Sequence, residues 1–371
     1  MRRTGGGNTS VLNDLLQRTG APSPLPLMHE PTPLEHRLDL SRDLGIRLFL
    51  KREDKIDDLG CGHKLRKLSY LMADALLRQS DVLVTSGSLP SNQCKAVAAL
   101  APRWGLRAHL VFGGDHQQRP DVAHGNYLLA TMCDPTVSWH EKSSWSAIGV
   151  HLEEAAAKER RSGARPYLIG SGASQGPGLL GSVEMGLEMA VQLDAQGVGE
   201  CHVVAVAGSG GTCLGLALAA RILDRPWKVS GICVGEPAQE VAARTLALLA
   251  DFEVRTGLSF PLQDVLEFTD IARGGGYDRP RDDELETVAM AVRRYGLLLD
   301  RNYMVKAFLG LRALLAAGQI RSGAAVLVHS GGHLGFFDSS DAWVRWHRDT
   351  CGALLACNNT PPQETPATGG L

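Results

Sequence analysis

Apolar and polar positions alternate along most of the chain with the periods typical of strands and helices. Short apolar runs between polar or glycine residues are typical of strands that are buried on both faces. We predict strands at residues 47–51, 81–86, 108–113, 165–169, 202–207, 227–234 and 325–329. Helices are expected between them, at residues 65–77, from about residue 93, from about residue 179 and up to residue 222. Strands that alternate with helices predict a parallel α/β fold.

Both ends of the chain depart from this pattern. Residues 1–20 begin polar and Gly-rich, and residues 358–371 are rich in Pro, Thr and Gly. Such segments bury too little apolar surface to offset the entropy lost when the backbone is ordered. We therefore expect flexible termini on either side of a folded core.

The composition allows one large or two medium domains and argues against several classes of function. The 371 residues are 44% hydrophobic, with a formal net charge of −2 and a pI of about 6.6. The chain has no excess of basic residues that would favour binding to nucleic acid. No apolar run approaches the ~20 residues that a membrane-spanning helix needs. The polar N-terminus does not resemble a signal peptide, so we expect a cytoplasmic protein without nucleic-acid or membrane partners.

The eight cysteines indicate reduced thiols rather than disulfides or a metal centre. None of them forms a CxxC pair, and no Cys/His spacing is typical of zinc, so we expect no metal. Most of them lie in apolar segments, which suits buried thiols in a reducing compartment. They are Cys61, Cys94, Cys133, Cys201, Cys213, Cys233, Cys351 and Cys357.

A glycine-rich turn, residues 207–212 (AGSGGT), follows a predicted strand and opens a predicted helix. Adjacent glycines let backbone N–H groups converge, and the helix N-terminus adds partial positive charge, so the turn suits a phosphate. A dinucleotide-binding turn needs a third glycine where Cys213 stands, and a Walker loop needs a Gly-Lys-Ser/Thr that is missing. We expect a single phosphate monoester here, and the alternative is a tight turn without a ligand.

Lys64 is a candidate for covalent chemistry. It lies in residues 62–68 (GHKLRKL), where the first predicted helix begins, and Lys67 follows on the same helical face. A lysine near another cation loses proton affinity, which favours the neutral amine that forms a Schiff base. The alternative is a solvated basic helix start.

The loop at residues 86–93 (SGSLPSNQ) also follows a predicted strand, at the kind of edge where parallel sheets bind ligands. Ser91 or Asn92 is equally suited to cap the helix that follows. The two roles are compatible, so both stay open.

Together these motifs resemble the 1-aminocyclopropane-1-carboxylate (ACC) deaminase and D-cysteine desulfhydrase family, whose members use pyridoxal 5′-phosphate (PLP). The similarity covers about residues 25–340. It runs through PTPLE (31–35), KRED (51–54), GHKLRKL (62–68), SNQ (91–93), GN (125–126), GSGGT (208–212), GY (276–277), LD (299–300), Tyr303, Lys306 and HSGG (329–332). It implies the two-domain α/β fold of tryptophan synthase β, called fold type II. A small domain at residues 67–175 would be inserted in a large domain of residues 21–66 and 176–357.

The resemblance also implies residues that hold the cofactor. Lys64 matches the Schiff-base lysine, and Asn92 matches the residue that bonds the 3-hydroxyl group of the pyridine ring. Ser330 matches a residue that faces the pyridine nitrogen in desulfhydrase-like members. The phosphate loop corresponds to Gly208, Ser209, Gly210, Gly211 and Thr212.

A second group of matched positions lies beside the substrate. Ser91, Tyr277 and Tyr303 match catalytic residues, and Gln93 and Met304 are further expected substrate contacts. Deaminases carry Glu and desulfhydrases commonly carry Thr where this chain has Met304. The acid that ACC deaminases place at the pyridine nitrogen is therefore missing.

Other positions depart from the family pattern as well. His63 replaces the usual Asn before the lysine, residues 87–90 (GSLP) replace Gly-Gly-x-Gln, and His333 replaces a smaller residue. These departures predict an altered pocket and a specialised substrate.

The expected activity is PLP-dependent elimination from a small amino acid, with release of a keto acid and ammonia, as in D-cysteine desulfhydrases. Lys64 or a base near Ser91 would remove the proton, and a neutral Ser330 would leave the pyridine nitrogen largely unprotonated. Three alternatives stay open: a β-replacement synthase, an ACC deaminase, and a PLP-binding protein without turnover. The resemblance also implies a homodimer.

Overall fold

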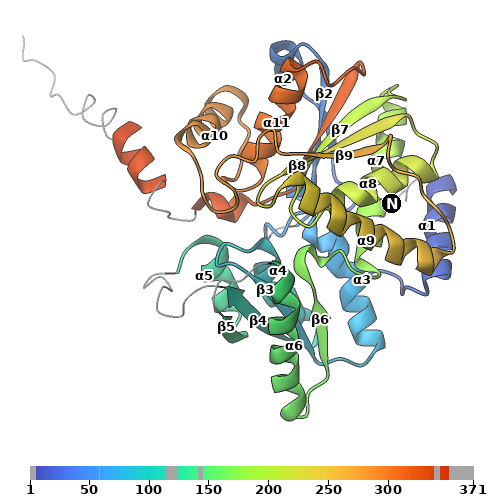
Figure 1. Cartoon of the computed structure of the whole chain (residues 1–371), viewed down its shortest axis with the longest axis vertical. Helices are drawn as coiled ribbons and strands as arrows, with labels where there is room; N and C mark the ends of the chain where they lie inside the picture. The colour runs from blue at the N-terminus through green and yellow to red at the C-terminus, as the bar shows by residue number, and fades with distance from the viewer. Residues whose placement is uncertain (1–5, 58, 114–122, 141–144, 338–342, 351–371) are drawn as a thin grey trace, which may run out of the picture.

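The computed structural model describes residues 6–57, 59–113, 123–140, 145–337 and 343–350, and its strands form two sheets (Figure 1). The larger sheet has the order β1 (Leu34–His36), β2 (Arg47–Arg52), β10 (Ala324–His329), β7 (Cys201–Ala207), β8 (Trp227–Cys233), β9 (Leu266–Thr269). The smaller sheet has the order β5 (Thr136–His140), β4 (Arg107–Gly113), β3 (Val82–Gly87), β6 (Pro166–Ile169). Only the β1–β2 pair is antiparallel among these described strands.

Each of the seven strands predicted from the sequence is present, with ends that differ by at most one residue. The described α-helices are α1 (Gly6–Thr19), α2 (Leu38–Leu44), α3 (Lys64–Leu77), α4 (Asn92–Leu100), α5 (Gly125–Met132), α6 (Trp145–Arg161), α7 (Gly178–Ala195), α8 (Gly211–Ile222), α9 (Ala238–Thr256), α10 (Asp282–Tyr295) and α11 (Met304–Ala316). Helices that cover mainly parallel sheets confirm the predicted α/β class.

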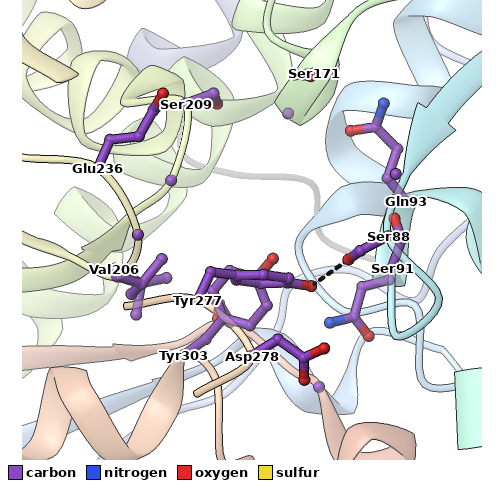
Figure 2. Close-up of a pocket in the computed structure, with 18 of the residues that line it drawn as sticks. Ser88, Ser91, Gln93, Ser171, Val206, Ser209, Glu236, Tyr277, Asp278 and Tyr303 are labelled. Atoms are coloured by element: carbon purple, nitrogen blue, oxygen red, sulfur yellow. Dashed lines mark hydrogen bonds between the residues drawn. The ribbon is translucent and has the colours of Figure 1, made fainter. Parts of the chain in front are cut away.

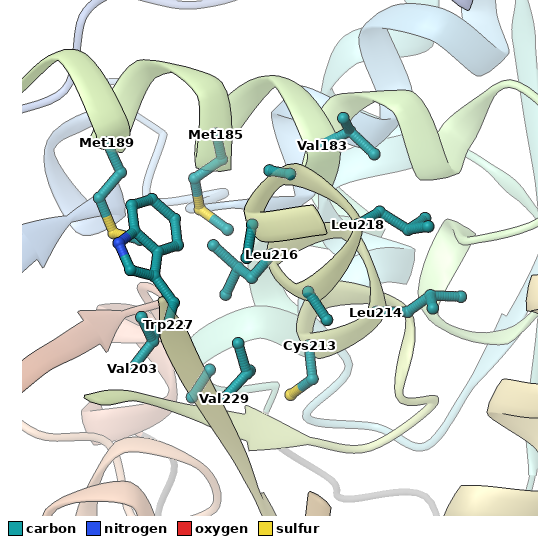
Figure 3. Packing of buried hydrophobic residues seen from close by; sticks show 14 of the residues in the cluster. Val183, Met185, Met189, Val203, Cys213, Leu214, Leu216, Leu218, Trp227 and Val229 are labelled. Atoms are coloured by element: carbon teal, nitrogen blue, oxygen red, sulfur yellow. The ribbon is translucent and has the colours of Figure 1, made fainter. Parts of the chain in front are cut away.

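The larger sheet is buried on both faces because successive strand residues point to opposite sides. On one face, Val203 and Val229 pack with Trp227 beneath α7 and α8 (Figure 3). On the other face, Val204 and Val206 pack in a cluster with residues of α2, α10 and α11. This double cover explains why the central strands have continuous apolar runs.

The first described residues are helical, so the prediction of a flexible stretch over residues 1–20 was wrong for residues 6–19. Gly6–Thr19 forms α1, and Leu15 is almost fully buried in the cluster of α7, α8 and α9. The apolar face of α1 consists of residues at helical spacing: Val11, Leu12, Leu15 and Leu16. Residues 358–371 lie outside the described part of the chain.

Helix α3 connects the two sheets. Leu68 and Leu71 pack in the cluster that covers the smaller sheet, whereas Arg66 on the same helix forms buried ion pairs with Glu53 and Glu188. Figure 1 shows α3 passing from the region of the larger sheet alongside the smaller one. The domain boundaries at residues 67 and 175 stay a proposal, because α3 contributes to both cores.

The cysteines and the helices can be compared with what the composition predicted. The six described cysteines are free, and all of them except Cys133 are buried. None of the helices in the described residues is both long and apolar enough to cross a membrane.

Candidate functional site

A cavity of about 490 Å³ lies where strands of the two sheets end (Figure 2). Its walls come from residues that directly follow β3, β6, β7, β8 and β10, together with the start of α3 and the loop that carries Tyr277. Carboxyl ends of parallel strands are the usual place for a ligand, because loops and helix N-termini converge there. The cavity is therefore the candidate active site.

Most of the residues expected from the sequence to form the site line this cavity. They are Lys64, Ser91, Asn92, Gln93, Gly208, Ser209, Gly210, Thr212, Tyr277, Tyr303 and Ser330. Gly211 and Met304 do not line it. The structure thus brings together residues that are up to 266 positions apart in the chain, and the functional role of each stays a proposal.

Lys64 is the first residue of α3 and is held close to the end of β10. The preceding turn packs so tightly that a Cβ on Gly62 would lie 2.2 Å from the carbonyl oxygen of Ser330. The backbone N–H of His63 donates to that same oxygen at 3.1 Å, and the His63 Nδ1 lies 2.9 Å from it. Lys64 therefore enters the cavity beside Ser330.

Burial lowers the pKa of Lys64 to about 8. From the sequence, the charge of nearby Lys67 was the expected cause of a lowered Lys64 pKa, and that expected cause was wrong. Burial also holds the pKa of Lys67 well below its usual value, and Lys67 donates to the Ser174 hydroxyl at 2.9 Å. Desolvation alone thus favours the neutral amine of Lys64 that Schiff-base chemistry needs.

We expect the rate at which PLP attaches to the cofactor-free protein to rise with pH through this pKa. The neutral fraction of an amine with a pKa of about 8 grows about fivefold between pH 7 and pH 8 and levels off above about pH 9. Stopped-flow absorbance after PLP is mixed with the cofactor-free protein measures this rate. A rate that keeps rising to pH 10 or beyond would contradict the lowered pKa.

The glycine-rich turn of residues 208–212 joins β7 to the N-terminus of α8. Gly210 has φ +85°, a conformation that glycine adopts without strain, and it stands directly before the first helical residue. The first N–H groups of any helix have no partner within the helix, so at this end of α8 they are available to an anion. Gly208, Ser209, Gly210 and Thr212 all line the cavity, as a phosphate site requires.

Gly211 faces away from this cavity, contrary to its expected place in the phosphate loop. A Cβ on Gly211 would lie 2.1 Å from the Ser174 hydroxyl oxygen. The residue is therefore small because the turn packs against the segment before α7, and only its backbone remains a candidate phosphate contact.

The opposite wall comes from the loop after β3 and the start of α4. Ser91 caps α4, because its hydroxyl accepts from the Cys94 N–H at 3.2 Å, and it lines the cavity as well. Asn92 accepts from the Asn126 side chain at 3.1 Å through its Oδ1. Gln93 donates to the Thr85 hydroxyl and to a carbonyl oxygen, both at 2.8 Å. These hydrogen bonds fix the orientation of the three side chains. The predicted role of Ser91 as the N-cap of α4 is confirmed.

Two tyrosines form the third part of the wall. The rings of Tyr277 and Tyr303 meet edge to face with centroids 5.5 Å apart. The Ser88 hydroxyl donates to the Tyr277 hydroxyl at 3.4 Å across the cavity (Figure 2). Burial raises the pKa of Tyr277 to about 12, so its hydroxyl stays protonated at neutral pH and is able to donate.

Met304 lies behind the cavity wall, so its predicted contact with the substrate was wrong. The side chain is fully buried at the start of α11, and its sulfur accepts from the Ser330 N–H at 3.3 Å. The Ser330 hydroxyl lies 3.5 Å from the same sulfur. Met304 therefore acts on the cavity only through Ser330.

Sequence reasoning missed several lining residues that also follow strands. Ser171 comes after β6, and Glu236 comes after β8. Arg273 and Asp278 lie in the loop before α10. The position of Ser171 and Glu236 at strand ends was a usable signal, whereas nothing in the local pattern marked Arg273.

Comparison with known proteins defines the class of this fold and site. Residues 25–331 match the family described as "Pyridoxal-phosphate dependent enzyme", and the chain belongs to this family. It is an enzyme whose cofactor is PLP.

The most informative relatives lie within the group that the motifs resemble. The chain is 32% identical over 311 residues to a D-cysteine desulfhydrase of Klebsiella pneumoniae, covering 83% of this chain and 93% of the relative. A solved structure of an "ACC deaminase homologue" superposes with a TM-score of 0.80 at 29% identity, covering 90% of this chain and 99% of the other. A threonine deaminase of Solanum lycopersicum shares the fold, with a TM-score of 0.60 at 18% identity.

The geometry of the cavity fits PLP. An amine with a lowered pKa lies in the same cavity as a glycine-rich helix start, and a cradle for the phosphate remains because a Cβ on Gly208 would meet no atom within 4 Å. The Ser330 hydroxyl offers a neutral hydrogen-bonding group at the same wall as Lys64.

Proposed function

We propose that this enzyme eliminates a β-leaving group from a small amino acid and releases a keto acid and ammonia, as a D-cysteine desulfhydrase does. The observation that carries the proposal is the pair formed by Ser330 and Met304. A hydroxyl backed by a thioether is neutral, so it does not hold a proton on a pyridine nitrogen as a carboxylate would. A weaker electron sink suits elimination from a substrate that has an acidic α-proton.

The cofactor supplies an electron-withdrawing group that stabilises negative charge at the substrate α-carbon. Lys64 would hold it covalently, and the backbone N–H groups of residues 208–212 would bind its phosphate. Asn92 would bond its 3-hydroxyl group, and Ser330 would be the residue offered to its ring nitrogen. These assignments are supported by the shared cavity and by the family resemblance.

The remaining residues move protons and orient the substrate. The neutral amine of Lys64 takes the α-proton, since burial lowers its pKa to about 8. Tyr277, protonated at neutral pH, donates a hydrogen bond to the substrate or to the departing group, and Tyr303 supports its ring. Ser91 orients the substrate carboxylate from the opposite wall, because its hydroxyl accepts from Cys94 and keeps its own hydrogen to donate. Gln93 offers its backbone N–H in the first turn of α4, since both N–H groups of its side chain are bonded to Thr85 and Gly170.

ACC is expected to be a poor substrate. It has no α-proton, so its ring opens by a route that depends more strongly on the electron sink. We expect kcat/KM for 2-oxobutanoate release from ACC to be at least about tenfold lower than kcat/KM for pyruvate release from D-cysteine or β-chloroalanine. A coupled keto-acid assay measures both rates.

Position 304 offers a matched pair of variants for this experiment. Met304→Glu places an acid behind Ser330 and should narrow the gap between the two substrates. Met304→Leu conserves the volume without adding a charge and should leave the ranking unchanged. Efficient ACC turnover by the unmodified enzyme would overturn the proposed substrate class.

A homodimer and a cytoplasmic location are also proposals. The family resemblance supports the homodimer. The free, buried thiols are compatible with the cytoplasm, which is a reducing compartment. Light scattering of the purified holoenzyme measures the oligomeric state directly, with a mass near twice 39.7 kDa expected.

A further inference from the structure

Outside the cavity, Asp54, His329 and His333 come together at the ends of β2 and β10. Parallel pairing sets His329 opposite Arg52, so Asp54, two residues beyond the strand, lies next to His329. Gly331 and Gly332 then turn the chain back with φ +102° and +91°. Potential ligand atoms of the three side chains all lie within 4.8 Å of one another.

The two contacts within this cluster are longer than good hydrogen bonds, and each histidine faces a different oxygen of Asp54. Asp54 Oδ1 lies 3.5 Å from His329 Nδ1, and Asp54 Oδ2 lies 3.4 Å from His333 Nε2. Good N–H···O hydrogen bonds span ~2.7–3.2 Å. Two ligands of a tetrahedral ion bound at ~2.0–2.1 Å are separated by about 3.3–3.4 Å.

His329 provides a second, independent observation. The residue is fully buried, and its Nδ1 has no hydrogen-bond partner. Its Nε2 lies 2.8 Å from the carbonyl oxygen of Leu298 and must carry the proton to bond it. The Nδ1 then holds a lone pair directed at Asp54, which is the tautomer and orientation that metal-binding histidines have.

Arg52 competes for the same carboxylate and has to be taken into account. It donates to both Asp54 oxygens at 2.8 and 2.6 Å, and it also donates to Glu35 at 2.7 Å. A carboxylate offers about four acceptor positions, so this fork leaves one position on each oxygen free for another partner. Arg52 therefore orients Asp54, and because Glu35 shares its charge, it weakens a metal site without blocking it.

We propose that Asp54, His329 and His333 bind one first-row divalent transition ion, with Zn²⁺ as the matching species. Two imidazoles and a carboxylate are typical zinc ligands, and a water molecule would complete the tetrahedron. The His333 side chain is 31% exposed, which leaves a path for the ion and room for that water. The proposal departs from the sequence expectation of no metal, which rested on Cys/His spacing and did not consider Asp54.

The ion would hold one wall of the cavity in place. His329 and His333 flank residues 330–332, and all three of these line the cavity beside Lys64. A metal bound to both histidines clamps this short loop at its two ends. We therefore expect Zn²⁺ to slow the release of PLP, which spectroscopy follows without any substrate.

The experiment uses the holoenzyme without a histidine tag, dialysed first against a chelator and then against Zn²⁺ or Co²⁺. We expect about one ion per chain by elemental analysis, and Co²⁺ difference absorbance of a tetrahedral nitrogen and oxygen site. His333→Ala should weaken binding at least ~10-fold, and Asp54→Asn should do so as well. His347→Ala, which removes an exposed histidine elsewhere, should change nothing.

Each other outcome overturns the proposal. No stoichiometric binding would do so, and so would equal affinity in the unmodified protein and in folded His333→Ala. A cobalt–thiolate band would assign the ion to a cysteine instead. Because the readouts are metal content, Co²⁺ spectra and PLP release, failure here is separate from failure of the proposed elimination.

Discussion

Replacing Lys64 with Ala should abolish the covalent cofactor linkage and lower kcat by on the order of 10²–10⁴-fold, because the residue both anchors PLP and moves the proton. Loss of the visible Schiff-base absorbance and keto-acid assays measure the two effects. Lys55→Ala is a suitable control, since that side chain is half exposed and paired with Glu35. It should keep both the absorbance and the activity.

Chemical mapping tests the same assignment in the unmodified enzyme. Reduction with borohydride makes the linkage permanent, and peptide analysis should then find the pyridoxyl group on Lys64. Lys67 and Lys306 are the informative competitors, because both are buried lysines, the first on α3 itself and the second on α11. A pyridoxyl group on either of them would refute the site as described.

Gly208→Val should weaken PLP binding by about 10–100-fold while the protein stays folded. A Cβ at position 208 meets no atom within 4 Å, so the substitution costs little in the free protein. The residue lines the cavity, so the branched side chain would occupy the space meant for the phosphate. Equilibrium dialysis of PLP and thermal melting of the cofactor-free protein separate affinity from stability.

Two further glycines sharpen this experiment. Gly199 also has open space around it but lies outside the cavity, so Gly199→Val should leave PLP affinity unchanged. Gly210 has φ +85°, and a Cβ there would lie 2.0 Å from the Thr245 hydroxyl oxygen. Gly210→Val should therefore lose stability as well as affinity. Unchanged affinity in folded Gly208→Val would mean that the turn binds no phosphate.

The central strands were predictable because a buried strand needs a continuous run of apolar residues, which is visible in the sequence. A strand covered by helices on both faces must be apolar at successive positions, and all seven predicted runs became strands, although β6 among them lies at the edge of the smaller sheet. The strands that were missed, β1, β5 and β9, are edge strands with mostly half-exposed residues. One exposed side removes the need for a continuous apolar run, so the pattern there is too weak to recognise.

The site was predictable to the extent that each residue belongs to a local motif. Lys64 at a helix start, Ser91 at a helix cap and the 208–212 turn each follow from short-range geometry. The family resemblance added Tyr277 and Ser330, which have no local signature. Their convergence needs two parallel sheets whose strands end at one cavity.

The amino-acid pattern by itself thus determined most of the helices and strands, because hydrogen bonding within a helix and burial of a strand both constrain residues that are neighbours in the sequence. Tertiary packing decided the rest. It buried Lys64 and so lowered its pKa, placed Met304 behind Ser330, and set Asp54 beside two histidines nearly 280 positions away. Desolvation and long-range contact depend on which segments meet, and no short stretch of sequence contains that information.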